Sequence, residues 1–97
     1  MMIKLKDIVK DTYTNASGYS LYTIINHELN SNKEIITLSF EGVSCTSSSF
    51  LNSSIGSLIE THGIAVLNRI KPVQVSTTQA ELLKKYVSSA SKATRKH

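Results

Sequence analysis

The 97-residue sequence predicts an α/β domain in which three helices pack on a small, mostly parallel sheet. Segments with an apolar residue at every second position alternate along the chain with segments whose apolar residues recur every three to four positions. These are the periods of strands and helices, respectively. Strands separated by helices are typical of parallel sheets with right-handed crossovers. All three helices can then lie on one face of the sheet and leave the other face partly open.

Length and composition indicate one domain over residues 1–97, with a basic tail that frays from about residue 92. Four Tyr, two Phe and no Trp mean that Ile, Leu and Val must build most of the core. The single cysteine, Cys45, cannot form an internal disulfide, which favours a reducing cytoplasmic setting. The longest clean apolar run, Ile64–Leu67, is too short to span a bilayer, and no membrane association is expected.

The first predicted strand covers Met2 to Val9, because Ile3 and Leu5 alternate with lysines. A helix follows that begins near Asn15 to Ser17, where Asn and Ser side chains can cap its first free amides. The segment Asn30–Asn32 ends this helix, since Asn and Ser favour turns. Its apolar face is formed by Leu21, Ile25 and Leu29.

The second predicted strand, Glu34 to Phe40, alternates apolar and polar residues, and the second predicted helix covers Phe50 to Thr61. A row of three hydroxyl residues, Ser47–Ser49, stands between them. Gly63 is predicted to end the helix in a left-handed conformation. The apolar face of this helix is formed by Leu51, Ile55, Leu58 and Ile59.

An almost continuous apolar run predicts a third strand over Ile64 to Ile70, closed by Pro72. Ser76–Thr78 can cap a last helix, in which Ala80, Leu83, Val87 and Ala90 mark the apolar face. These elements predict one shared core formed by Ile36, Leu38, Phe40, Leu51, Ile55, Leu58, Val66, Leu67, Leu83 and Val87.

The sequence Phe40-Glu41-Gly42-Val43 followed by Ser47-Ser48-Ser49-Phe50 resembles the STAS-like family, relatives of the STAS domains of anti-sigma factor antagonists. In those relatives a strand leads through an Asp-Ser-Ser-Gly turn into a helix, and the first serine is phosphorylated. The resemblance places Ser47 on the Asp, Ser48 on the phosphorylated serine, Ser49 on the second serine and Phe50 on the Gly. Because the Asp and the Gly are replaced, the resemblance is to the STAS-like branch rather than to the phosphorylated antagonists.

The resemblance implies a STAS-like single domain of a bacterium or phage that acts as a non-enzymatic regulatory protein-binding module. In the wider group, the strand-to-helix corner and the following helix dock onto a partner, often an ATP-binding, histidine-kinase-like regulator. Carried over to this chain, the partner-binding residues are Ser47, Ser48, Ser49, Phe50, Ser53, Ser54 and Ser57. Ser48 is the candidate phosphorylation site.

The serine row has three interpretations from its chemistry alone. One hydroxyl can cap the helix by accepting from a backbone amide, which contributes about 1 kcal/mol. A phosphoserine here would gain from the free amides and the positive end of the helix dipole. Nucleophilic catalysis is the weakest interpretation, because the row contains no general base. Ser53, Ser54 and Ser57 make the predicted outward side of the helix small and uncharged, which suits either a partner surface or a solvated face.

The net charge of +4 is concentrated at the C-terminal end. Five cations and no acid follow Glu81, namely Lys84, Lys85, Lys92, Arg95 and Lys96. The alternative function is therefore a nucleic-acid or acidic-surface binder that uses the basic C-terminal helix. Cations also favour helix C-termini and solvated tails for purely local reasons.

Other chemistry is poorly represented, so we expect no enzyme activity, no cofactor and no metal. His27, His62 and His97 lack the spacing of metal ligands with each other or with Cys45. A free Cys in a strand-like stretch is expected to be a small buried hydrophobic residue. The four glycines lie far apart and form no phosphate-binding loop.

Overall fold

A three-stranded parallel sheet forms one layer of the computed structural model, which describes residues 2–31, 34–43 and 46–94, and side chains as far as residue 89. The strands are β1 (Met2–Lys4), β2 (Ile36–Ser39) and β3 (Ile70–Val73), with β2 in the centre. Parallel pairing places Leu38 between Ile3 and Pro72. The α/β class and the parallel sheet are as the sequence predicts.

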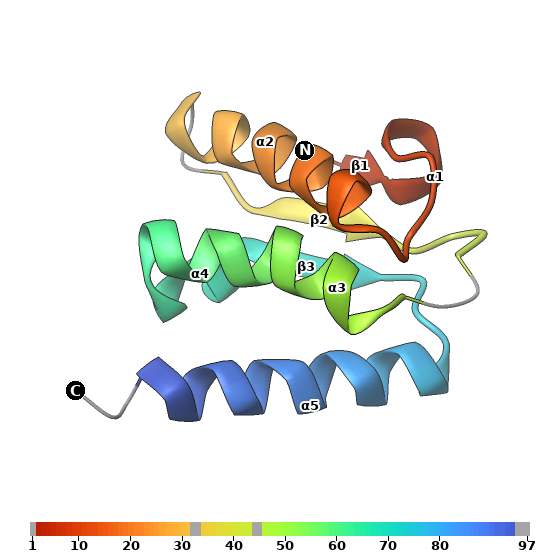
Figure 1. Ribbon diagram of the computed structural model, residues 1–97. Coiled ribbons are helices and arrows are strands. Elements are labelled where there is room, and N and C mark those ends of the chain that lie inside the picture. The colour runs from red at the N-terminus through yellow and green to blue at the C-terminus, as the bar shows by residue number, and fades with distance from the viewer. Residues whose placement is uncertain (1, 32–33, 44–45, 95–97) are drawn as a thin grey trace.

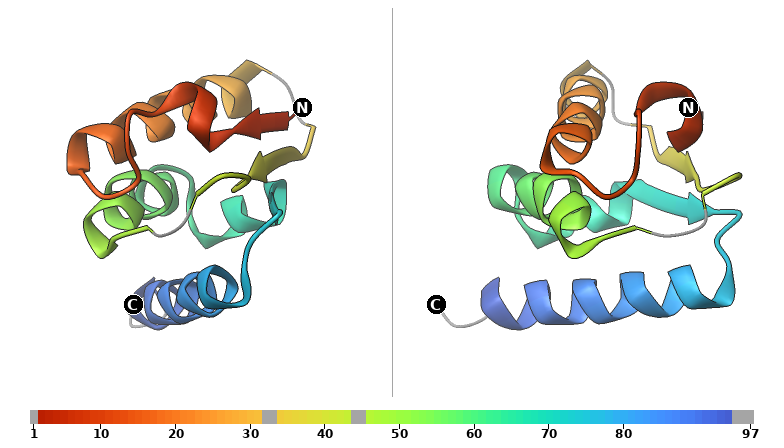
Figure 2. Two further views of the ribbon diagram at one scale, coloured as in Figure 1. Left: turned by 90° about the vertical axis from the view of Figure 1, so that its right-hand side faces the viewer. Right: turned by 45° about the vertical axis from the view of Figure 1, so that its right-hand side comes forward.

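The second layer is made of helices on one face of this sheet (Figures 1 and 2). Helix α2 (Asn15–Ser31) lies beside a continuous helical segment formed by α3 (Ser48–Leu51), the π-helical turn η1 (Asn52–Gly56) and α4 (Ser57–His62). Helix α5 (Thr77–Thr94) lies on the other side of that segment. The opposite face of the sheet is open, as expected, and exposes Met2, Ile35 and Lys71. None of the described helices is long and apolar enough to cross a membrane.

The predicted first strand is wrong beyond Lys4. Residues Leu5–Ile8 form a single helical turn, α1, closed by a 3.1 Å hydrogen bond from the Val9 amide to the Leu5 carbonyl. Because β2 ends at Ser39, which pairs with Lys4, the strand partner of β1 stops at this point. The helical turn instead buries the Leu5 side chain completely.

The predicted third strand is also wrong, because Ile64–Arg69 forms a 3-10 helix, η2, and β3 begins only at Ile70. An apolar run alone does not separate a strand from a buried helical turn. Pro72 does not close the strand but lies within it, on an edge strand, where a missing backbone N–H is tolerated. Gly63, which precedes η2, has the expected positive φ of 88°, but its ψ of 167° is extended rather than left-handed helical.

Helix α2 begins and ends where the sequence predicts, but its cap lies one residue earlier than expected. The Thr14 hydroxyl accepts a 3.2 Å hydrogen bond from the Ser17 amide. Asp11 supports this turn by accepting from the amides of Tyr13 (3.1 Å) and Thr14 (2.9 Å). Desolvation acts to raise the pKa of Asp11, but the hydrogen bonds from Tyr13 and Thr14 outweigh it and lower that pKa below its usual value.

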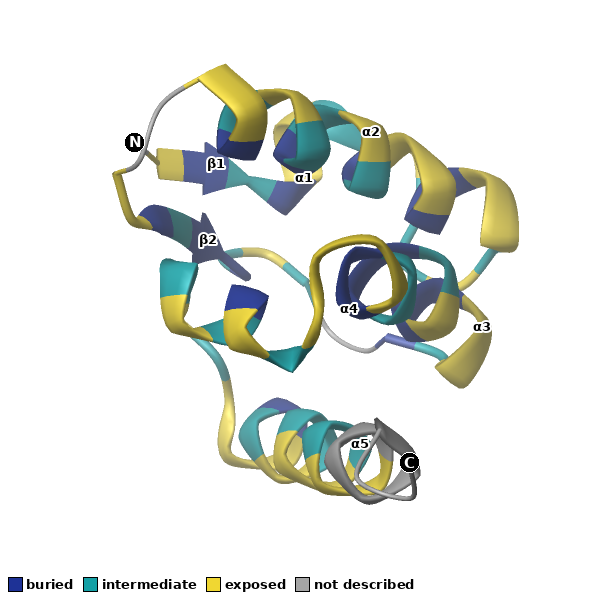
Figure 3. Cartoon of the chain, turned by 90° about the vertical axis from the view of Figure 1, so that its left-hand side faces the viewer, coloured by how far each residue is buried: buried dark blue, intermediate teal, exposed yellow. Residues whose placement is uncertain are grey.

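Most of the predicted core is buried in one cluster. Its predicted members are Ile36, Leu38, Phe40, Leu51, Ile55, Leu58 and Val66, joined by Ile3, Leu5, Leu21, Ile25, Leu29, Phe50 and Ile59. Leu67 and Leu83 are partly buried and pack against this cluster, and Val87 is half-buried on α5. Figure 3 shows that the buried sides of α2 and of the α3–α4 segment face each other and the sheet.

The contact between α2 and α3 depends on Gly18. A Cβ atom at this position would lie 2.6 Å from the Phe50 carbonyl oxygen and 2.7 Å from the Ser53 Cβ. Both distances are far below van der Waals contact, and the carbonyl belongs to the backbone and cannot rotate away. Glycine is therefore required for the two helices to approach this closely.

Substituting Gly18→Ala should destabilise the fold by about 1–3 kcal/mol, because the added methyl overpacks the helix contact. Ordinary helix propensity predicts the opposite sign, since alanine exceeds glycine by about 1 kcal/mol in a helix interior. Urea denaturation of the variant measures the change. The matched control is Ala16→Gly at an exposed α2 position, which should cost about 1 kcal/mol from propensity alone. A stabilised Gly18→Ala protein would contradict the close contact.

Helix α5 is capped as predicted, and Gln79 and Tyr86 are two of its described side chains that contact the rest of the fold. The Ser76 hydroxyl accepts a 3.2 Å hydrogen bond from the Gln79 amide, and the buried Gln79 side chain accepts one of 3.1 Å from Thr46. Further along, the Tyr86 hydroxyl abuts the backbone at Gly56, where a Cβ would collide with it. Burial, and then the negative charge of Glu60, raise the pKa of Tyr86 above its usual value.

Because the pKa of Tyr86 is raised in the folded protein, the contribution of Tyr86 to the free energy of unfolding varies with pH in the alkaline range. The folded-state pKa lies above the unfolded value of about 10, so the contribution is fully present below pH 10 and is lost as the pH rises through the folded pKa. We expect the free energy of unfolding of the parent to fall more steeply above pH 10 than that of Tyr86→Phe. Urea denaturation at a series of alkaline pH values measures both slopes. Equal slopes would show that Tyr86 ionises as freely in the folded protein as in the unfolded chain.

Candidate functional site

Ser47 caps the helical segment, which confirms the capping interpretation of the serine row. Its backbone is extended, with φ −93° and ψ 164°, and its hydroxyl accepts a 3.1 Å hydrogen bond from the Phe50 amide. The Leu51 amide donates to the Ser47 carbonyl at 3.1 Å. The helix begins at Ser48, two residues before the predicted start.

Ser47 also connects this corner to the loop that precedes α2. Its hydroxyl donates to the Tyr13 carbonyl at 2.8 Å, and its amide donates to the Thr12 carbonyl at 3.1 Å. The hydroxyl therefore both donates and accepts inside the structure. Ser48 and Ser49, in contrast, are exposed.

Phe50 and Ser54 do not lie on an outward surface, which corrects the prediction for these two residues. Their exposed fractions are 1% and 0%, and the Ser54 hydroxyl donates to the Phe50 carbonyl at 2.7 Å. Position 54 follows Leu51 by three residues and precedes Leu58 by four, so it falls on the apolar stripe. That spacing is visible in the sequence and predicts burial.

The other two serines of the predicted face are half-buried. The Ser53 hydroxyl lies within hydrogen-bonding distance of Asn15 Oδ1 (2.8 Å) on α2 and of the Ser49 carbonyl (2.9 Å). The Ser57 hydroxyl contacts the Asn52 carbonyl at 3.5 Å. Serine hydroxyls thus reach carbonyl groups four or five residues earlier along the segment. Such bonds compete with the α-helical pattern, which gives a physical reason for the π-helical turn at Asn52–Gly56.

Helix α2 and the α3–α4 segment together form an outward surface that is poor in charge. Between them they contain only two charged residues, Glu28 and Glu60, and no Lys, Arg or Asp. We call this surface the α2–α4 face. It consists of Asn15, Tyr19, Tyr22, Asn26, Ser48, Ser49, Ser53, Ser57, Thr61 and His62.

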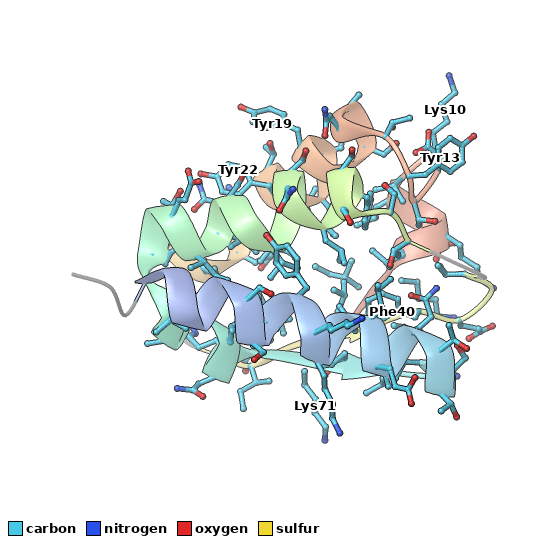
Figure 4. The ribbon with its side chains drawn as sticks, turned by 60° about the horizontal axis from the view of Figure 1, so that its bottom comes forward. Lys10, Tyr13, Tyr19, Tyr22, Phe40 and Lys71 are labelled. Atoms are coloured by element: carbon cyan, nitrogen blue, oxygen red, sulfur yellow. The ribbon has the colours of Figure 1, made fainter. Side chains whose placement is uncertain are left out.

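Hydrogen-bonding side chains join the two halves of the α2–α4 face. Besides the Ser53–Asn15 contact, the hydroxyls of Tyr22 and Thr61 lie 3.0 Å apart, and His62 Nε2 lies 2.6 Å from Asn26 Oδ1. Tyr19 is 63% exposed and its ring centroid lies 5.8 Å from that of Tyr22 (Figure 4). Sequence reasoning missed the α2 half of this surface. The absence of charge from residues 15–26 is the signal that could have found it.

A second feature, a pocket of about 330 Å³, lies beside the serine corner. Its lining comprises Lys6, Val9, Lys10, Asp11, Thr12, Tyr13, Gly42 and Val43. Thr12 and Tyr13 are the residues whose carbonyls bind Ser47, so the pocket wall and the corner are held together. Lys6 forms an exposed 3.1 Å ion pair with Glu41. The hydrogen bond and charge of Lys6, and then the charge of Lys4, lower the pKa of Glu41.

Metal-ligating residues, Cys45 and the basic C-terminal end are the other features that the sequence singles out. In the described portion of the chain, no group of three or more His, Cys, Asp or Glu side chains is placed to hold a metal ion. Cys45 lies outside the described residues. Lys84 and Lys85 are exposed on α5. The other cations of the basic end, Lys92, Arg95 and Lys96, have side chains outside the described part.

Comparison with known proteins gives one match. The family model described as "STAS-like domain of unknown function (DUF4325)" matches residues 17–80, which is more than half of the chain. The matched segment contains most of α2, all of β2, the serine row, the α3–α4 segment and β3, and the first turn of α5. No curated protein and no solved structure matches. The match confirms the resemblance inferred from Phe40–Val43 and Ser47–Phe50.

The geometry of the corner distinguishes its first two serines by their contributions to stability. Ser47→Ala should lower the free energy of unfolding by about 0.5–2 kcal/mol, because it removes the cap of the segment. Ser48→Ala, at the neighbouring exposed position, is the matched control and should change stability by less than about 0.5 kcal/mol. Thermal or urea unfolding of both variants measures the difference. A larger loss at Ser48 than at Ser47 would contradict the assignment of the cap.

Proposed function

The chain belongs to the STAS-like family, and from that premise we propose that it is a non-enzymatic regulatory module that binds a protein partner. The partner surface is the exposed part of the serine corner together with the α2–α4 face. The proposed partner is an ATP-binding, histidine-kinase-like regulator, and the proposed setting is the cytoplasm. This partner class comes from the resemblance of the corner to that of anti-sigma factor antagonists.

The observation that carries the proposal is the composition of the α2–α4 face. Protein interfaces are depleted of Lys, Glu and Asp in their centres and enriched in Tyr. Tyr19 and Tyr22 lie within the face, with uncharged Asn, Ser and Thr side chains around them. A partner can cover this surface without desolvating charged groups, whose burial is costly unless they are paired.

The structure narrows the set of serines available for contact. Ser48 and Ser49 are exposed, and Ser53 and Ser57 are half-buried, with Ser53 at the contact with α2. Ser47, as the cap, positions the corner from within. Phe50 and Ser54 are removed from the proposed contact set because they belong to the core.

Phosphorylation of Ser48 is proposed as the regulatory step. Ser48 is exposed and is the first residue of a helical segment that extends to His62. A phosphate at this end is favoured by the helix dipole, and it would add about two negative charges beside a neutral surface. If the partner covers this corner, desolvation of that charge would weaken the complex. The family's Asp is replaced by the capping Ser47, so partner binding need not depend on phosphorylation.

Calorimetric titration of the purified kinase-like regulator into the domain tests the proposal. Ser49→Arg should weaken binding at least tenfold, because it places a bulky cation within the proposed contact surface. Ser48→Asp should also weaken it. The matched control is Ser88→Arg, an exposed serine on α5 that receives the same side chain and should leave affinity unchanged.

Two outcomes would contradict the proposal. Equal affinity of Ser49→Arg and Ser88→Arg would place the partner surface elsewhere. Binding to DNA or RNA that is lost in the Lys84→Glu/Lys85→Glu variant, and that weakens steeply with salt, would favour the basic helix as the functional surface. Binding of the regulator that persists at high salt supports the uncharged face.

A further inference from the structure

An apolar pocket of about 160 Å³ lies between α5 and the rest of the fold, away from the α2–α4 face. Strands β2 and β3, the turns η1 and η2, and helix α5 all contribute to its wall. The lining residues are Leu38, Phe40, Ile55, Leu67, Ile70, Pro72, Leu83 and Val87. Figure 4, viewed from the α5 side, shows Phe40 behind this helix.

Every side chain of the lining is apolar, and the burial of each residue indicates whether it lies at the floor or at the rim of the pocket. Leu38, Phe40 and Ile55 are buried and form the floor, whereas Pro72 is exposed and belongs to the rim. None of the eight side chains carries a hydrogen-bonding group. The backbone of Pro72 lacks an N–H as well, so that part of the rim offers no donor. A polar ligand would therefore lose its hydrogen bonds to water without replacement.

We propose that this pocket binds a small apolar ligand, namely an aromatic ring or a short aliphatic chain of about six carbon atoms. The size follows from volume, since a dry cavity of about 150 Å³ lined by Leu, Ile and Phe accepts benzene. Protein interiors are normally close-packed, with few voids larger than a water molecule. A ligand in the pocket would make dispersion contacts with its eight lining side chains.

The attachment of α5 explains why the pocket does not simply close. Gln79 is held through Thr46, and the Tyr86 hydroxyl abuts Gly56. Leu83, which lines the pocket, lies between these two points along the helix. Because both contacts fix α5 against the fold, moving Leu83 onto the floor would require breaking at least one of them. The pocket is therefore maintained by contacts that lie outside its lining.

The test uses benzene and xenon as probes on the full chain, with methyl resonances followed by NMR. Saturable shifts should be confined to the methyl groups of Leu38, Ile55, Leu67, Ile70, Leu83 and Val87. The melting temperature should rise with benzene concentration, because a ligand that binds only the folded state stabilises it. Val87→Phe fills the pocket and should weaken benzene binding at least tenfold. The matched control, Ser88→Phe, adds the same ring at the adjacent exposed position and should bind as the parent does.

If Val87→Phe does not fold, the NMR titration of the parent protein with benzene still tests the proposal. Absence of saturable shifts up to the aqueous solubility of benzene would overturn the proposal, as would shifts centred on Leu21 and Ile25, which do not line the pocket. Unchanged benzene affinity in a folded Val87→Phe protein would place the bound ligand outside this pocket.

Discussion

The close approach of α2 and the α3–α4 segment at Gly18 is the constraint on which the rest of the helical layer depends. The Phe50 carbonyl lies where a side chain at position 18 would begin, so the helices can meet only because glycine has none. At this separation, Asn15 reaches Ser53, Tyr22 reaches Thr61, and Asn26 reaches His62. These contacts join two helical elements into one outward surface. A wider separation would divide that surface by a groove and remove the contacts between its halves.

Hydroxyl groups make the surface neutral without leaving many polar groups to desolvate. The Ser53 hydroxyl is within hydrogen-bonding distance of the Ser49 carbonyl in its own segment, and the hydroxyls of Tyr22 and Thr61 lie 3.0 Å apart. A polar side chain that is already hydrogen-bonded inside the protein loses less on docking than one that is bonded to water. The serine-rich composition therefore serves two purposes, since it shapes the π-helical turn and lowers the cost of covering the face.

Sequence periodicity predicts the fold class, the order of the main elements and the capped strand-to-helix corner, because each depends on local spacing. It fails at Leu5–Ile8, because β2 is too short to pair with these residues. It also fails at Ile64–Arg69, because the edge strand β3 begins only after this segment. The spacing of Ser54 from Leu51 and Leu58 also predicts that Ser54 is buried, although a small polar side chain at this position suggests exposure. The joined α2–α4 face could not be predicted from local pattern, since it requires knowing that α2 lies beside α3.

The proposed pocket and the serine corner are separate surfaces, and Phe40, the residue after β2, begins the chain segment between them. The Phe40 ring lies on the pocket floor, its amide donates to the Val73 carbonyl at 3.0 Å, and its carbonyl accepts from the Val43 amide at 2.9 Å. The chain then continues to Ser47, which is hydrogen-bonded to the loop before α2. A change of the Phe40 side chain would therefore alter the pocket, whereas the backbone hydrogen bonds of Phe40 hold the chain segment that leads to the corner. Val87 and Ser49 each belong to one surface only, so substitutions there can separate ligand binding from partner binding.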